Sequence, residues 1–341
     1  MKQKKQFLIL AIVLIFGMIV AGCDLYGRFF GDRPGSTGTT GFFEWQIDTD
    51  GSKRITNYIG SGGAVTIPPM LNGIAVRSIG ERAFQNSQLT SVTIGDNVVK
   101  IEDFAFFSNQ LTNITFSNNV TYIGINAFGR NRLTNVYIPS SITHIGSMAF
   151  VDNPLISIEV APGNNTFTVR DFFLLSKDET KLINYYGSLI NVAIPDGVTE
   201  IGRNAFAGTQ VTNVTIPDSV ITIGPWAFMN APLINVAIGN GVTHIEARAF
   251  QGNQLTSVII PSNVRFIRHD AFSNNPLISI TIGANVVIGG WVTGIPGAFG
   301  IWDAQTQTHI PSGFEAAYEA SGRAAGTYTR SGVYSTVWTR Q

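Results

Sequence analysis

Apolar residues recur along this chain at fixed positions of a 22-residue interval. The dipeptide Ala-Phe marks one such position, with its Phe at Phe84, Phe106, Phe128 and Phe150, then at Phe206, Phe228, Phe250 and Phe272, and once more at Phe299. A complete unit is Leu89-x-x-Val92-x-Ile94-x-x-x-Val98-x-x-Ile101-x-x-x-Ala105-Phe106-x-x-Asn109. A short, repeated period of this kind is typical of solenoids, in which each repeat contacts only its neighbours.

Each unit contains three kinds of local pattern. The Leu-x-x-Val-x-Ile segment alternates and is rich in β-branched residues, which predicts a short strand with one apolar face. The Val-x-x-Ile segment predicts a second short extended stretch. We expect a short helical turn at Ala-Phe, where Pro225 occupies a position that suits the first residue of a helix. Asn residues close the coils, and their amides can bond backbone groups in the bend: Asn109, Asn131, Asn153, Asn253 and Asn275.

A single coil cannot fold alone, because ordering its backbone costs more than burying its few apolar side chains returns. Stacking at the strand spacing adds ladder hydrogen bonds and covers both faces of each Phe layer. We therefore expect a β-rich solenoid of stacked coils over residues 67–303, with short parallel strands and short helical turns. Residues 42–66 and 304–341 depart from the period and are expected to cap the two open ends, the second with a helix from Phe314 to Ala320.

The interval between Phe150 and Phe206 is too long for the period. We interpret residues 155–188 as one long coil of 34 residues, with an excursion that leaves the stack unbroken.

These units resemble the BspA-type leucine-rich repeats of bacterial surface proteins, and the long interval resembles a variant repeat of the same family. The resemblance implies a leucine-rich repeat solenoid. It also implies attachment to another macromolecule, since the family includes adhesins, although a repeat scaffold does not fix its partner.

The N-terminus has the features of an export signal. Lys2, Lys4 and Lys5 precede an uncharged apolar run from Phe7 to Val20, which is short for a permanent membrane span. The following Val20-Ala21-Gly22-Cys23 resembles the lipobox of bacterial lipoproteins. We expect a signal peptide over residues 1–22, lipidation of Cys23, and a flexible tether over residues 23–41.

Composition excludes several kinds of protein. The chain has 22 Lys+Arg and 22 Asp+Glu, and only 13% of its residues are charged. We therefore do not expect the protein to bind the phosphate backbone of a nucleic acid. One Cys excludes an intramolecular disulfide. We find no catalytic motif and expect no cofactor, no metal site and no enzymatic activity. His144 and His244 share a repeat position several coils apart, and the acidic residues, including Glu81 and Glu102, are scattered.

The remaining candidate for function is the outward face of the Leu-x-x-Val-x-Ile strands, which is concave in leucine-rich repeats. The row after the Val supplies the candidate binding residues Thr115, Tyr137, Glu159, Thr215, Ile259 and Thr281. Tyr137 and Ile259 break an otherwise small and polar pattern. A neighbouring row contains only Ser and Asn, and a solvated ladder without a partner is the alternative interpretation of this face.

Two functions remain open at this stage. The first is a lipid-anchored protein of the outer cell surface that binds a protein or another macromolecule. The second is a periplasmic structural or glycan-binding lipoprotein, which Asp24 directly after the Cys leaves open.

Overall fold

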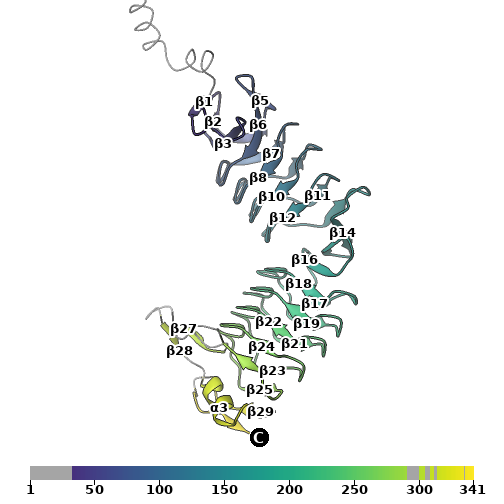
Figure 1. Cartoon of the computed structure of the whole chain (residues 1–341), viewed down its shortest axis with the longest axis vertical. Coiled ribbons are helices and arrows are strands. Elements are labelled where there is room, and N and C mark those ends of the chain that lie inside the picture. Colours follow the sequence, from purple (N-terminus) through teal and green to yellow (C-terminus); the bar gives the residue numbers. More distant parts are fainter. Residues whose placement is uncertain (1–32, 290–298, 304–307, 311–312, 334) are drawn as a thin grey trace, which may run out of the picture.

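The computed structural model describes residues 33–289, 299–303, 308–310, 313–333 and 335–341. The repeats form an elongated, bent stack of coils, so the predicted leucine-rich repeat solenoid is confirmed (Figure 1).

Each regular coil contributes two short strands. The first row comprises β4 (Gly63–Thr66), β7 (Leu89–Thr93), β9 (Asn113–Thr115), β11 (Asn135–Ile138), β13 (Ser157–Val160), β17 (Asn191–Ala193), β19 (Asn213–Ile216), β21 (Asn235–Ile238), β23 (Ser257–Ile259) and β25 (Ser279–Ile282).

The second row comes later in the same coils, before each Ala-Phe turn. It comprises β6 (Ile74–Ile79), β8 (Lys100–Ile101), β10 (Tyr122–Ile123), β12 (His144–Ile145), β18 (Glu200–Ile201), β20 (Thr222–Ile223), β22 (His244–Ile245), β24 (Phe266–Ile267) and β26 (Val287–Ile288). Where strands of successive regular coils pair, they do so in parallel and in the repeat register, so that Asn213 lies opposite Asn235 and Ile223 opposite Ile245. In the first row, β9 and β11 are not paired, and neither are β21 and β23. The register explains why the apolar positions recur so strictly.

The repeated Phe side chains form two columns of stacked rings in the core. Neighbouring ring centroids lie 4.8 Å apart between Phe84 and Phe106 and 5.1 Å apart between Phe228 and Phe250. These separations match the spacing of paired strands, so every ring contacts one ring above and one below. Tyr58 begins the first column and Tyr185 the second, each 5.1 Å from the next ring.

The Ala-Phe segments are chains of tight turns, and the expected short helical turns are not formed. Phe107 N–H donates to Phe104 O at 3.0 Å, but Phe104 and Ser108 both adopt the left-handed region, with φ of 57° and 59°. Left-handed residues cannot continue an α-helix. The turn backbone instead bonds to the next coil, as where Phe106 N–H donates to Ala127 O at 2.8 Å.

The coil-closing Asn residues bond the backbone as predicted, and all except the half-buried Asn153 are buried. The amide of Asn131 donates to Phe106 O and Phe128 O, both at 3.0 Å, and its oxygen accepts from Leu111 N–H at 3.0 Å. One side chain thereby satisfies backbone groups of two coils. Asn109, Asn153, Asn253 and Asn275 repeat the pattern.

The long interval forms an antiparallel meander of β14 (Phe167–Arg170), β15 (Phe173–Ser176) and β16 (Lys181–Tyr185). It divides the molecule into two hydrophobic cores, so the expectation of an unbroken stack is wrong. Successive side chains of β15 point to opposite faces, and Leu174 packs in the N-terminal core while Phe173 and Leu175 pack in the C-terminal core. The meander lies where the molecule bends (Figure 1).

The N-terminal boundaries also differ from the sequence prediction. Residues 37–40 belong to an ordered strand, β1 (Thr37–Thr40), which pairs with β2 (Phe43–Ile47), so the flexible tether does not extend to residue 41. β2 pairs in turn with β3 (Lys53–Tyr58), and the short β5 (Met70–Leu71) pairs with β6. Since β4 already pairs in parallel with β7, the solenoid ladder begins inside the predicted cap over residues 42–66.

The C-terminal residues close the other end of the stack. They contain β27 (Ile301–Asp303), β28 (Thr308–Ile310), β29 (Gly326–Thr329), β30 (Thr339–Arg340) and the helix α3 (Phe314–Ala320), at the residues predicted to be helical. β29 pairs with β25 in the antiparallel sense, which ends the first row. Phe314 of α3 meets Phe299 edge-on at 4.7 Å and ends the second ring column.

Replacement of one buried ring tests the two-core organisation. We expect Phe228→Ala to lower the free energy of unfolding by about 3–5 kcal/mol, because the cavity removes ring contacts on both sides. Phe266→Ala is the control, since that half-buried ring lies outside the core, against His244 and the Arg268 guanidinium; its loss should be about 1 kcal/mol. Hydrogen exchange during denaturation should show residues 89–128 still protected after the C-terminal core opens. Equal losses, or simultaneous loss of protection throughout, would contradict the assignment.

Candidate binding surfaces

The candidate residues of the first strand row lie on one outward face. Thr115, Glu159 and Thr215 are exposed. Tyr137 keeps 51% of its surface exposed and Ile259 69%, values that are high for residues of their size. The strand row therefore presents these side chains to solvent, with the buried Leu, Val and Ile positions behind them.

The register brings some candidates together and keeps others apart. Tyr137 lies directly opposite Glu159 on β13, and Ile259 lies opposite Thr281 on β25. Thr281 is only half exposed, because β29 covers it and the Thr281 and Thr327 hydroxyls lie 2.9 Å apart. Thr115 pairs with Thr93, and Thr215 lies between two alanines.

The neighbouring Ser and Asn row forms an amide and hydroxyl ladder. Asn213 donates from its amide to Asn191 Oδ1 at 2.6 Å, and Asn235 donates to Asn213 Oδ1 at 2.8 Å. Ser157 Oγ donates to Asn135 Oδ1 at 2.7 Å. These bonds join successive coils on the surface and orient the side chains, so this row supports the face as well as coating it with polar groups.

A second apolar row on this face was missed by the sequence analysis. It occupies the position directly after the first Leu of the unit, where Thr alternates with the exposed residues Ile156, Ile190, Ile234 and Ile278. The repeat already contained the signal, since neighbouring strand residues point to opposite sides and the Leu position is buried in most coils. The face is therefore more apolar than the candidate residues alone indicate.

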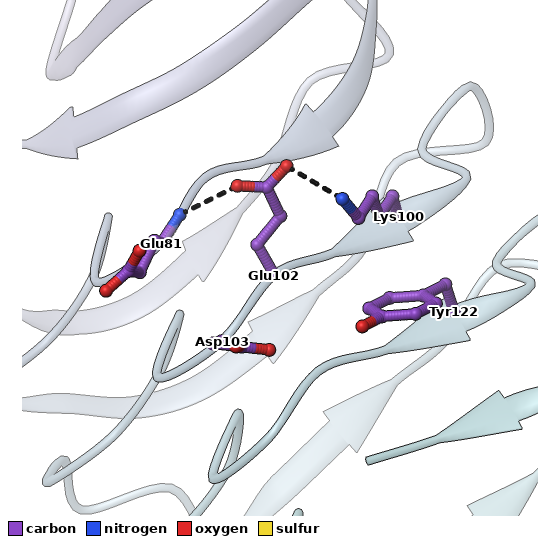
Figure 2. A pocket seen from close by; sticks show the side chains of 5 residues that line it. All are labelled: Glu81, Lys100, Glu102, Asp103 and Tyr122. Atoms are coloured by element: carbon purple, nitrogen blue, oxygen red, sulfur yellow. Dashed lines mark hydrogen bonds and ion pairs between the residues drawn. The ribbon is translucent and has the colours of Figure 1, made fainter.

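A shallow polar cleft of about 130 Å³ lies on another surface, near the second strand row. Glu81, Lys100, Glu102, Asp103 and Tyr122 line it (Figure 2). The prediction that the acidic residues are scattered is wrong for Glu81 and Glu102. They lie 21 positions apart, one short of the repeat, so adjacent coils bring them together.

The polar groups of this cleft satisfy one another. Glu102 accepts from Lys100 Nζ at 3.2 Å and from Glu81 N–H at 3.2 Å, as the dashed lines in Figure 2 show. Its carboxylate also lies 3.6 Å from Arg54, and Asp103 Oδ1 accepts from Ile125 N–H at 2.8 Å. The carboxylate of Glu102 thus connects neighbouring coils, and the cleft is lined by a surface ion-pair network.

The histidines stack on aromatic neighbours of the second row. The His144 ring lies 4.3 Å from Tyr122, and the His244 ring lies 5.0 Å from Phe266. Over the described residues, no three His, Cys, Asp or Glu side chains come close enough to form a metal site. Cys23 lies outside the described residues, and in the described part of the chain no helix is long and apolar enough to cross a membrane.

Comparison with known proteins identifies the repeat. A model of the BspA type leucine-rich repeat region matches the chain in 6 copies, over residues 66–176 and 181–291. None of the curated proteins matches the chain.

Several solved structures are similar. The pneumococcal vaccine antigen PcpA is 21% identical, with a TM-score of 0.52 over 74% of this chain and 83% of that chain. A leucine-rich cell surface protein from Faecalibacterium prausnitzii is 25% identical, with a TM-score of 0.42 over 71% of this chain and 86% of that one. A leucine-rich repeat protein from Eubacterium ventriosum is 18% identical, with a TM-score of 0.45 over 75% and 93% of the two chains. The likeness to PcpA shows a common fold and nothing further.

Neutralising Glu102 tests whether the cleft is a structural network. We expect Glu102→Gln to lower the free energy of unfolding by at most about 1 kcal/mol, because the pairs with Lys100 and Arg54 are partly exposed. Glu246→Gln is the matched control at the same repeat position, where Arg268 lies 4.0 Å away; its effect should be smaller still. Urea denaturation of both variants measures the difference. A loss above about 3 kcal/mol for Glu102→Gln would require a buried, uncompensated charge instead.

Proposed function

Because the chain belongs to the BspA-type leucine-rich repeat family, we propose that it is a non-catalytic, lipid-anchored protein of the bacterial cell surface whose outward strand face binds a macromolecular partner. The observation that carries the proposal is the exposed strand face itself, on which Tyr137 and Ile259 project from a regular polar ladder. Large exposed side chains on a rigid scaffold are the residues that interfaces use as anchors.

The sequence of the N-terminus supports the anchoring part of the proposal. The basic start, the apolar run from Phe7 to Val20 and the single Cys in Ala21-Gly22-Cys23 fit a lipoprotein signal. Each buried methylene of an acyl chain contributes about 0.8 kcal/mol, and several chains hold a protein on a membrane stably. Two of the similar structures are described as a vaccine antigen and as a cell surface protein. These descriptions apply to those proteins, and they favour a location at the cell surface for this one.

Protease treatment of intact cells tests the location. We expect added protease to remove peptides of residues 42–341 from unbroken cells, and Cys23→Ser to abolish labelling by radioactive palmitate and release the protein from the membrane. A denatured sample must be cut under the same conditions, since stacked coils resist proteolysis. Full protection until lysis would instead favour the alternative, a periplasmic structural or glycan-binding lipoprotein.

Substitution on the strand face tests the binding surface. We expect Tyr137→Ala to weaken adhesion to immobilised extracellular-matrix proteins or to neighbouring bacteria about tenfold, as loss of an anchor side chain does. Its stability should change by less than about 0.5 kcal/mol, because the side chain is exposed. Tyr122→Ala, on the second strand row, is the control and should bind normally. Unfolding of Tyr137→Ala, or equal adhesion of both variants, would contradict the assigned face.

A further inference from the structure

The meander interrupts the strand face and leaves β17 with a partner on one side only. β17 pairs with β19, and Ile194 N–H donates to Thr215 O at 3.0 Å. Backbone groups of successive strand residues point to opposite edges, so those of Asn191 and Ala193 face the meander. Within the described residues, no strand pairs with β17 on that side. An edge of this kind is a template for another strand.

The opposite side of the interruption is covered in part by the meander. Tyr186 packs against the N-terminal core, which contains Ile158 of β13, and its hydroxyl donates to Asp171 O at 3.0 Å. Burial raises the pKa of Tyr186. On the C-terminal side, β17 keeps one edge without a strand partner among the described residues.

Exposed apolar side chains surround the β17 edge. Leu189 and Ile190, directly before the strand, each keep 54% of their surface exposed, and Ile156 on the preceding coil keeps 68%. Phe172 of the meander is 36% exposed. Aliphatic groups concentrated beside unpaired backbone are typical of a surface that binds a peptide, because they contact its side chains while the edge bonds its backbone.

The charges around this edge are acidic. Glu159, Asp171 and Asp196 are exposed, and none of their carboxylates forms an ion pair within the described residues. The nearby Arg170 is already paired with Glu179 at 2.7 Å, and Lys181 with Glu200 at 2.6 Å. A partner with basic side chains would complement these carboxylates.

We propose that β17 binds an extended segment of a protein partner as an added strand, and that this segment alternates apolar and basic residues. The proposal rests on the function proposed above and names the class of partner and the centre of the binding face. The free N–H and C=O groups of Asn191 and Ala193 match a peptide backbone, which a glycan does not have.

The test uses the mature chain and a defined probe, a fluorescein-labelled decapeptide of alternating Val and Lys. Fluorescence anisotropy should detect binding to the unsubstituted protein, and Ile190→Asn should weaken it at least about tenfold. Ile278→Asn is the matched control, because Ile278 has the same repeat position and 42% exposure but precedes β25, which pairs with β23 on one side and β29 on the other. That variant should bind normally.

A second variant tests the backbone pairing directly. Ala193→Pro removes an N–H from the free edge and should also lower affinity at least about tenfold. Hydrogen exchange should show the amides of Asn191 and Ala193 protected only when the Val-Lys peptide is present. Should Ala193→Pro fail to fold, the comparison of the two Ile variants and the exchange experiment still decide the matter.

Three outcomes would overturn this inference. They are equal affinity of the Ile190→Asn and Ile278→Asn variants, equal binding of a Val-Glu peptide, and an absence of peptide binding with capture of a neutral oligosaccharide instead. Each of these leaves the proposed function intact if Tyr137→Ala still reduces adhesion. If Tyr137→Ala has no effect either, the strand face is not a binding surface and both proposals fail.

Discussion

The stacking of successive coils in one register is the constraint on which the whole molecule depends. Ring centroids in the Phe columns lie within 4.7–5.8 Å of each other, close to the distance between paired strands. Coils of one length keep rings and strands at this common spacing most simply. Near the ends of the columns, Tyr185 and Phe206 still stack across 21 residues, and Phe272 and Phe299 across 27. The strict period in the sequence is therefore a consequence of backbone pairing and ring stacking acting together.

The same constraint explains how a longer segment is accommodated. The meander does not stretch one coil within the stack. It instead ends one core and begins another, with Leu174 packed on one side and Leu175 on the other. Tyr185 then takes the place of a Phe and starts a new ring column. A two-faced sheet can cover both cores because its side chains alternate.

The sequence predicted what the period determines and missed what departs from it. The solenoid, the buried positions and the role of residues such as Asn131 follow from repetition, since each observation is made many times over. The turns at Ala-Phe were predicted as helical because their residues are helix-compatible, yet pairing with the next coil selects the left-handed φ of residues such as Phe104. The proximity of Glu81 and Glu102 depends on an offset of one residue from the repeat, which no motif reveals.

Function in such a scaffold is confined to the positions that stacking leaves free. Buried layers accept few substitutions, and the Asn ladder on the surface is itself tied to the register. Chemical variety therefore appears at outward positions such as Tyr137, and above all where the period is interrupted. At the meander, Tyr186 packs on the N-terminal core, and β17 keeps one edge without a strand partner among the described residues. The interruption of the repeat thus leaves a strand edge unpaired beside a sheet that still covers the core, and this is where we place the proposed peptide site.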